Sequence, residues 1–383
     1  MADPPPAPAP DPAPGGPPPH PAPCAAFVVP GDIRTRTGGY LYDRRLIEAM
    51  ARLGRPVRLI EAPAAWPDPD EAAQDALIRR LRALPPQAPV ILDGLVFGAI
   101  ATEALAGIDA PLIAMLHHPL GLEPGLPPAR AARLLAQEAA NLRHAAQVVV
   151  PSAHVAQMAT SRLGVPAGRV RVARPGFDRP EPSAPAPAPA HPPLILSVGI
   201  ICARKGHDVL LRALARIAHL DWRAAVAGMV QDRQLHRDLL ALRDDLGLSA
   251  RVAFLGEVDP DPLERLFRTA RIFALATRYE GYGMVLAEAQ IHGLPIVSCA
   301  VGAVPLTVPP EAGLLVPPDD PEAFGAALER VLADRRLAED LASGSERAGR
   351  GLPRWDDAAR VMCEAVAQAA PDRGPRRRDG LVP

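Results

Sequence analysis

Two glutamates and two glycines in the C-terminal half of the sequence have the spacing of a site for a phosphorylated ligand. Glu280 and Glu288 have seven residues between them, and Gly281 and Gly283 are among these seven. The apolar run Ile272–Ala276 predicts a strand before the turn, and a helix is expected to start near Gly283. Free N–H groups and the dipole of a helix N-terminus favour anions, and glycines let the backbone approach a phosphate closely. An ordinary strand-to-helix turn is the alternative.

Three further segments carry residues suited to phosphate or sugar chemistry, and each follows a predicted strand. Gly38 and Gly39 stand before an amphipathic helix, where turn chemistry alone would also explain them. His117 and His118 end an apolar strand, although imidazole is costly to bury without partners. Structural packing is the alternative for both histidines. Lys205 immediately precedes a glycine that opens a predicted helix, where its ammonium could reach a phosphate.

A metal site at the two histidines is not expected. Neighbouring side chains of an extended segment point in opposite directions, and no third ligand is near. Asp93 follows the predicted strand Val90–Leu92, so it could contact an acceptor or cap the next helix. Arg34 and Arg36 of the first glycine loop could add positive charge, although loop arginines are usually solvated.

Strand-like runs alternate with helical stretches along the chain and would position these residues. In the first half we predict strands at 25–29, 57–61, 90–92, 111–116, 147–150 and 170–173, with helices at 40–53, 70–84, 97–106 and 129–144. In the second half we predict strands at 194–199, 223–226, 252–255, 271–276 and 295–299, with helices at 207–217, 235–246, 262–269, 321–332, 337–350 and 355–369. This alternation predicts α/β architecture with parallel sheets covered on both faces. Ligands then bind at the carboxyl ends of the strands.

Length and composition limit the number of domains and the classes of partner that the chain can have. A chain of 383 residues fits two domains of about 150–200 residues each. The formal net charge of −1 argues against a nucleic-acid partner. The four cysteines form no Cys-x-x-Cys pair, and we interpret them as buried, reduced thiols of a cytoplasmic protein.

Many of the 48 prolines gather in segments without apolar periodicity. Residues 1–23 lack the basic and apolar regions of a signal peptide, so we expect a disordered tail there and a second one at 371–383. The Pro/Ala run at 180–193 is expected to link two domains. No stretch of 18 apolar residues predicts a membrane span. Peripheral membrane contact remains open because the last tail carries several arginines.

The stretch from Glu280 to Glu288, continued by Val301–Pro305 and Gly313–Pro317, resembles the donor-site signature of retaining glycosyltransferases of family 4. The resemblance covers about Val28 to about Val366. It implies the GT-B fold, in which two Rossmann-like parallel-sheet domains face each other across a cleft. The acceptor domain would be residues 24–179 and the donor domain 194–353, with the helix 354–370 packing back on the acceptor domain.

The resemblance also implies a role for each matching residue. Glu280 would bind sugar hydroxyls and steady an oxocarbenium-like centre, with His117 beside the donor sugar and Lys205 at the donor phosphate. Glu288 would bind ribose hydroxyls, and the Gly39 amide would close on the diphosphate from the opposite domain. The implied donor-binding set is Gly38, Gly39, Arg204, Gly281, Tyr282, Gly283, Met284, Val285, Glu288 and Val258, the last in the loop expected to receive the base.

The function implied is transfer of a sugar from a UDP- or GDP-sugar, or an ADP-sugar, to an acceptor with retained anomeric configuration. No metal or other cofactor is implied. The acceptor would be a small molecule or glycan, which the sequence does not identify. The same fold serves sugar phosphorylases and epimerases, and a non-catalytic nucleotide-sugar-binding module is a further alternative. A nicotinamide-dependent oxidoreductase is set aside because no Gly-x-Gly-x-x-Gly opens the first helix of either half.

One position departs from the family pattern. Family 4 usually has an arginine directly after the first glycine of the segment that begins at Gly199, and Ile200 stands there. Either Arg204 supplies the missing cation, or the diphosphate is held more weakly, or the donor differs.

Overall fold

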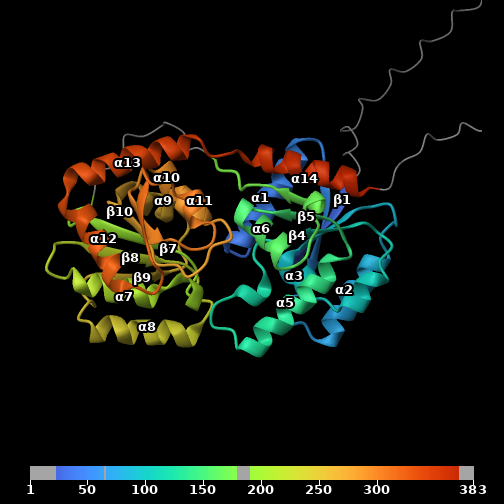
Figure 1. Ribbon diagram of the computed structural model, residues 1–383, viewed down its shortest axis with the longest axis horizontal. Helices are drawn as coiled ribbons and strands as arrows, with labels where there is room; N and C mark the ends of the chain where they lie inside the picture. The colour runs from blue at the N-terminus through green and yellow to red at the C-terminus, as the bar shows by residue number, and fades with distance from the viewer. Residues whose placement is uncertain (1–22, 64–65, 179–189, 371–383) are drawn as a thin grey trace, which may run out of the picture.

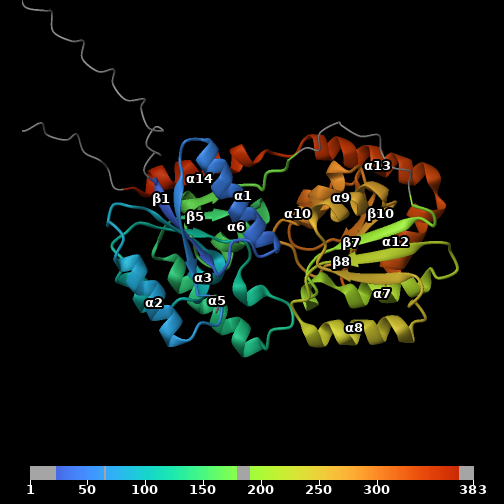
Figure 2. The ribbon, with the colours of Figure 1, turned by 180° about the vertical axis from the view of Figure 1, so that it is seen from behind.

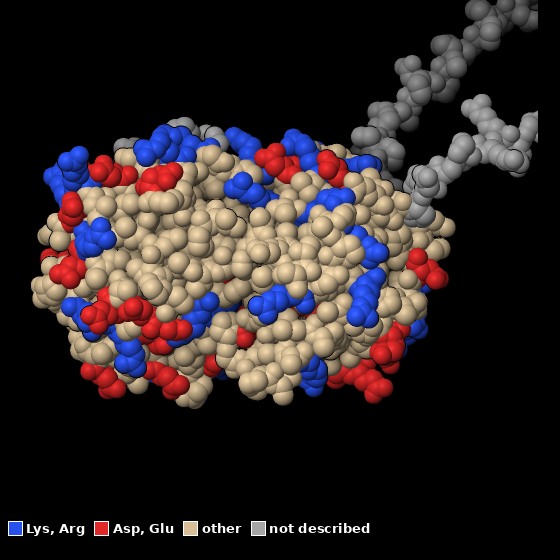
Figure 3. All heavy atoms as spheres, viewed as in Figure 1, with Lys and Arg blue, Asp and Glu red and all other residues tan. Residues whose placement is uncertain are grey.

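The computed structural model describes residues 23–63, 66–178 and 190–370, which form two lobes side by side (Figure 1). Almost all of the two expected tails and most of the expected linker lie outside these residues. On the face shown in Figure 3, basic and acidic side chains are interspersed around broad areas without charge. None of the helices in the described part is long and apolar enough to cross a membrane.

The first lobe is built on a six-stranded parallel sheet in the order β2-β1-β3-β4-β5-β6. Its strands are β1 (Ala25–Pro30), β2 (Val57–Ala62), β3 (Val90–Asp93), β4 (Leu112–Met115), β5 (Ala145–Val150) and β6 (Val170–Val172). The central strands β1, β3 and β4 are buried along their whole length. Such strands read as continuous apolar runs because helices cover both faces of the sheet.

The helices of the first lobe follow these strands along the chain. They are α1 (Gly38–Arg52), α2 (Glu71–Arg82), α3 (Gly94–Ala99), α4 (Thr102–Ala106), α5 (Pro128–Leu142) and α6 (Ala153–Ser161), with short 3₁₀ turns η1 (Leu120–Leu122) and η2 (Ala167–Arg169). The single helix expected at 97–106 was wrong, because the backbone is extended at Ile100. The Asn141 side-chain amide donates to the carbonyls of Phe97 and Ile100, which replaces the helical hydrogen bonds lost at the break.

The second lobe repeats the plan with the strand order β12-β11-β10-β7-β8-β9, again all parallel. Its strands are β7 (Leu194–Val198), β8 (Arg223–Ala227), β9 (Val252–Gly256), β10 (Ile272–Leu275), β11 (Ile296–Cys299) and β12 (Gly313–Val316). Its helices are η3 (Ala203–Lys205), α7 (His207–Arg216), α8 (Arg233–Asp245), α9 (Pro260–Thr269), α10 (Met284–Ile291), α11 (Val304–Thr307), α12 (Pro321–Ala333) and α13 (Arg335–Arg350). The chain reverses its direction of strand addition between β7 and β10, and ligands bind at such a switch point.

The last helix, α14 (Trp355–Ala369), leaves the second lobe and lies along the first (Figures 1 and 2). Trp355 is buried, and its ring meets Tyr42 of α1 edge to face at 5.4 Å between centroids. The apolar face of α14 joins the core formed by α1 and one face of strands β1, β3, β4 and β5. The two segments that run between the lobes touch each other, since the Phe177 amide donates to the Pro353 carbonyl.

The two sheets face each other with the α/β arrangement that the GT-B fold describes. The expected strands lie where the sequence places them to within a few residues, whereas β12, α6 and α11 were not expected. A serine N-cap marks the start of α6, because the Ser152 hydroxyl accepts the Val155 amide. The cysteines are free, but Cys24 and Cys363 are partly exposed, so the expectation that all four are buried was wrong.

Candidate active site

The segment after β10 forms a tight turn that opens α10. Gly283 adopts φ 86°, a left-handed conformation that glycine accepts without strain, and α10 begins at the next residue. The first amides of α10, at Met284 and Val285, have no acceptor within the helix and are available to an anion. The Glu280 carbonyl accepts the Ala303 amide, which fixes the turn from the β11–α11 side. The predicted helix N-terminus is therefore present at the predicted place.

Glu280 is the centre of a buried ionic cluster. Its Oε1 lies 2.6 Å from Lys205 Nζ and 3.0 Å from Thr277 Oγ1, and its Oε2 lies 3.6 Å from Arg204 Nη1. Burial opposes ionisation of Glu280, but Lys205 and Arg204 outweigh it and hold the pKa of its carboxyl below the usual value. Glu280 is therefore a carboxylate at neutral pH. The loops after β7 and β10 meet here, at the switch point of the second sheet.

Arg204 lies at the junction of the two lobes. Besides Glu280, its guanidinium contacts Glu123 of the first lobe at 3.2 Å, and Glu123 in turn lies 3.1 Å from His118 Nε2. Arg204 and Lys205 thus both contact the Glu280 carboxylate, so a second cation stands beside Lys205. Ile200 itself contributes its carbonyl, which lies 3.3 Å from His207 Nε2.

His117 lies between two buried aspartates. Its Nε2 is 2.9 Å from Asp43 Oδ1 and 3.4 Å from Asp93 Oδ2. Burial opposes protonation of the imidazole, but the two carboxylates outweigh it and raise the pKa of His117 to about 10. Asp93 also caps α3 by accepting the Leu95 amide, so the expected cap is present. One potential ligand atom from each of these three residues lies within 4.8 Å of the others. The expectation that no further metal ligand is near His117 was therefore wrong.

The two lobes touch at His117 and the glycine turn. A Cβ on Gly281 would lie 2.3 Å from the His117 carbonyl oxygen, so only glycine fits at this contact. Ser152 of the first lobe donates its hydroxyl to the Gly281 carbonyl at 2.6 Å. Gly39 lies beside the imidazole, where an added Cβ would stand 3.6 Å from the His117 ring. Both glycine loops thus lie next to His117, one at its backbone and one at its ring.

Glu288 differs from Glu280 in having no cation beside it. It lies on α10, and no donor among the described residues binds its carboxylate. Burial, together with the nearby Glu264, raises the pKa of Glu288 to about 7. A partly buried carboxylate without partners is suited to accept hydrogen bonds from ligand hydroxyls.

Several other predicted residues have partners of their own. Arg34 pairs with Asp32 in the exposed first glycine loop. Arg36 crosses to the second lobe, where it contacts Glu257 at 3.2 Å and Asp259 at 2.9 Å. These two acids flank Val258 in the loop after β9, the loop expected to receive the base.

At the first turn of α10, the groups available to a ligand are backbone amides more than side chains. The Tyr282 side chain is buried against Phe177, with ring centroids 6.3 Å apart, in a small cluster that also contains Ala287. Met284 packs partly against the core of the first lobe. A Cβ added to Gly38 would have no neighbouring atom within 4 Å.

The chain matches known families in both halves. The family described as Glycosyltransferase Family 4 matches residues 41–180, and Glycosyl transferases group 1 matches residues 192–334. The D-inositol 3-phosphate glycosyltransferase of Xylanimonas cellulosilytica is 31% identical over 290 residues, which are 70% of this chain and 69% of that protein. The chain belongs to glycosyltransferase family 4. The enzyme of the same name from Mycolicibacterium gilvum is 34% identical over 199 residues, 49% of this chain and 44% of its own length.

Solved structures share the fold of this glycosyltransferase. Sucrose-phosphate synthase from Thermosynechococcus elongatus has a TM-score of 0.75 at 24% identity, covering 90% of this chain and 98% of that one. Anabaena HepE, solved with UDP-glucose, has a TM-score of 0.70 at 17% identity, covering 90% and 99%. These likenesses show the GT-B fold.

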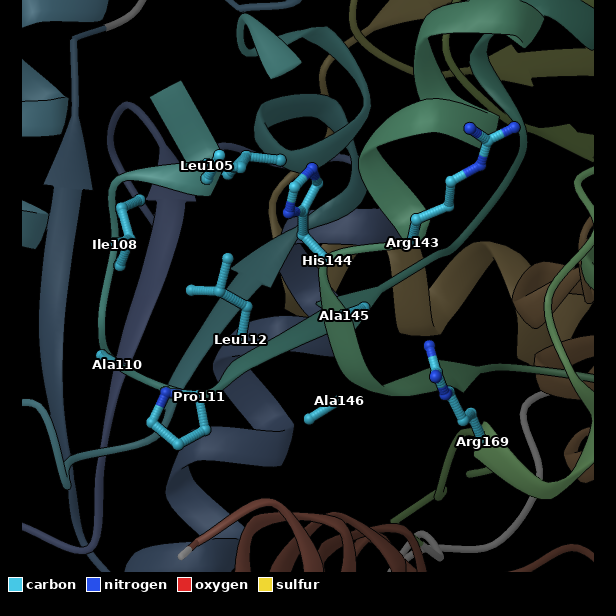
Figure 4. A pocket seen from close by; sticks show the side chains of 11 residues that line it. Leu105, Ile108, Ala110, Pro111, Leu112, Arg143, His144, Ala145, Ala146 and Arg169 are labelled. Carbon is cyan, nitrogen blue, oxygen red and sulfur yellow. The ribbon is translucent and has the colours of Figure 1, made fainter. Parts of the chain in front are cut away.

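A separate hollow of about 360 Å³ lies in the first lobe of the glycosyltransferase (Figure 4). Arg143, His144 and Arg169 line it together with apolar residues next to the beginnings of β4 and β5. It is therefore at the amino ends of the strands, on the edge of the sheet opposite His117. The predicted site residues lie at the carboxyl ends.

Asp43, Asp93, Glu123 and His154 are site-lining residues that sequence reasoning missed or left undecided. For Asp43 a signal was present, because it falls on the apolar face of α1 with Leu46 and Met50, three and seven residues later. A carboxylate on that face needs a buried partner. For Glu123 and His154 the sequence offers no comparable signal.

Proposed function

We propose that this glycosyltransferase moves a sugar from a nucleoside-diphosphate sugar to an acceptor hydroxyl, with retention of the anomeric configuration and without a metal ion. The observation that supports this most directly is the convergence of Lys205, Arg204 and the N-terminus of α10 on Glu280. Two cations and free helix amides at the switch point of a sheet suit a diphosphate. The UDP-glucose in the HepE structure supports the same class of donor.

The proposed roles follow from charge and position. Lys205 and Arg204 stabilise the negative charge that grows on the leaving diphosphate, together with the Gly39 and α10 amides. Glu280, kept ionised by these cations, faces the positive charge that develops at the anomeric carbon. Glu288 accepts the ribose hydroxyls, which supply the donors that its carboxylate lacks.

The step itself exchanges one bond for another at the anomeric carbon. The bond from this carbon to the diphosphate oxygen breaks, and the diphosphate leaves with the electron pair. The acceptor oxygen forms the new bond on the same face, and its proton passes to a phosphate oxygen of the leaving group. No protein base is required for this proton.

Nucleotide binding tests the proposal first. We would record melting temperatures of the wild type, Glu288→Ala and Glu322→Ala with UDP, GDP, ADP and their glucose or mannose conjugates. A ligand at 100 times its dissociation constant stabilises by about 2.7 kcal/mol. One nucleotide should raise the melting temperature of the wild type and of Glu322→Ala, which alters an exposed residue of α12. The rise should be lost in Glu288→Ala. No rise with any nucleotide would overturn the proposal.

A phosphorylase or epimerase would bind the same donor, so turnover separates these functions. Incubation of the wild type with the stabilising sugar nucleotide should give a glycosylated acceptor, with an α-linked donor giving an α-linked product by NMR. A requirement for free phosphate would instead indicate a phosphorylase. Binding of a sugar nucleotide without transfer or hydrolysis would indicate a binding module. The pairing of Arg204 with Glu280 favours the enzyme, because it restores the cation that Ile200 removes.

A further inference from the structure

Three polar atoms are buried without a hydrogen-bond partner where the two lobes meet. They are His118 Nδ1 from the loop after β4, His154 Nε2 from α6, and Tyr279 Oη from the loop after β10. The rings lie together, since Tyr279 is 4.4 Å from His118 and 5.7 Å from His154 between centroids. The side chains of His118 and His154 from the first lobe and of Tyr279 from the second therefore form one cluster.

Leaving these atoms unpaired is costly. A buried donor or acceptor without a partner costs about 1–3 kcal/mol, and a native structure keeps such groups for a reason. Both loops of the cluster lead directly to the site, because His118 follows His117 and Tyr279 precedes Glu280. A ligand that enters between the lobes beside the donor sugar would meet all three atoms.

The charges around the cluster are already compensated. Glu123 pairs with His118 Nε2 and with Arg204, so its carboxylate is compensated, while the Arg204 guanidinium also lies toward Glu280 on the donor side. Burial and the adjacent His118 lower the pKa of His154, which keeps this imidazole neutral at pH 7. Burial raises the pKa of Tyr279 to about 12, so its hydroxyl keeps its proton. Neutral imidazole and phenol groups each donate or accept one hydrogen bond, as the hydroxyls of a polyol do.

We infer that His118, His154 and Tyr279 form the acceptor subsite, and that the acceptor is a neutral polyhydroxylated molecule, a sugar or a cyclitol. This inference rests on the proposed transfer function. The subsite takes hydroxyls in place of a phosphate, in contrast to the phosphorylated acceptor in the name of the D-inositol 3-phosphate glycosyltransferases. His154 and Tyr279 bind and orient the acceptor, and take no proton from it.

Acceptor kinetics test the inference. With the donor identified by melting temperature, transfer would be measured to glucose and myo-inositol and to glucose 6-phosphate and inositol 3-phosphate. The variants are Tyr279→Phe and His154→Gln, with His144→Gln in the far hollow as the matched control. Each lost hydrogen bond should raise the acceptor KM about fivefold to tenfold. The nucleotide dissociation constant from calorimetry should change less than about twofold, and His144→Gln should match the wild type.

The outcomes separate the two proposals. Transfer to the phosphorylated compounds alone would overturn the neutral acceptor while leaving the donor reaction standing. A loss of nucleotide affinity equal to the rise in KM would place these side chains at the donor and overturn the subsite. Failure of the wild type to bind any nucleotide would overturn the proposed function itself. Far-ultraviolet circular dichroism of each variant would show that a changed KM does not reflect unfolding.

Discussion

Glu138 of α5 makes the stability of the first lobe depend on pH. It is 1% exposed, its Oε2 accepts the Leu120 amide at 3.1 Å, and its Oε1 has no partner among the described residues. Burial raises its pKa from 4.5 to about 8. The folded chain therefore holds this proton more tightly than the unfolded chain. The stability that this provides is fully present below pH 4.5 and is lost as the pH rises through about 8.

The size of the effect follows from the two pKa values. One pKa unit corresponds to about 1.4 kcal/mol. From 4.5 and about 8, the loss of folding free energy is about 1 kcal/mol at pH 5 and about 4 kcal/mol at pH 8. Glu138→Gln cannot ionise, so the variant should gain about 3 kcal/mol relative to the wild type between these pH values.

Melting temperature measured from pH 5 to pH 8 checks this prediction. For a unit of about 150–250 residues, 1 kcal/mol shifts the melting temperature by about 2–4 °C. Between pH 5 and pH 8, the melting temperature of Glu138→Gln should therefore rise relative to that of the wild type by on the order of 10 °C. The control is Glu103→Gln, an exposed residue of α4 that removes the same charge and should keep a constant offset. Parallel curves for Glu138→Gln and the wild type would refute the reasoning.

Three further predictions concern the site. Glu280→Gln should lower kcat for transfer at least about 100-fold and leave nucleotide affinity within about fivefold. Steady-state kinetics would measure kcat, and calorimetry would measure the affinity. An unchanged kcat would contradict the proposed role of Glu280. Asp43→Asn should lower the pKa of His117 from about 10 and move the basic limb of the pH–rate profile to lower pH; an unmoved limb would show that another group titrates there. Transfer should persist in EDTA, and a loss restored by added Mn²⁺ would assign a metal to Asp43, Asp93 and His117.

The strand–turn–helix units of the site could be predicted from the sequence because their signals are local. An apolar run, a glycine with φ 86° and a helix start determine the turn at Glu280 over a dozen residues. The loop that carries Lys205 is defined in the same way. These local units, repeated along both halves, also indicated the two parallel sheets.

The partners within the site could not be predicted because they come from distant segments. His117 meets Asp43, which is 74 residues away, and Arg204 meets Glu123 of the other lobe. The pairing of carboxylates with cations depends on how the two lobes pack against each other. The residue pattern of a single helix or strand does not indicate this packing. Tyr282 shows the same limit, since its neighbour Phe177 determines where its ring points.

The return of α14 to the first lobe affects how the chain is made. The core of that lobe stays incomplete until α14 has been synthesised, long after the synthesis of β1. The second lobe is continuous and contains its own core, so it can fold while the first still waits. Contacts between Tyr42 and Trp355 span most of the sequence, which adds a slow, long-range closure to folding. Loss of α14 would thus leave the core of the first lobe incomplete while that of the second lobe is complete.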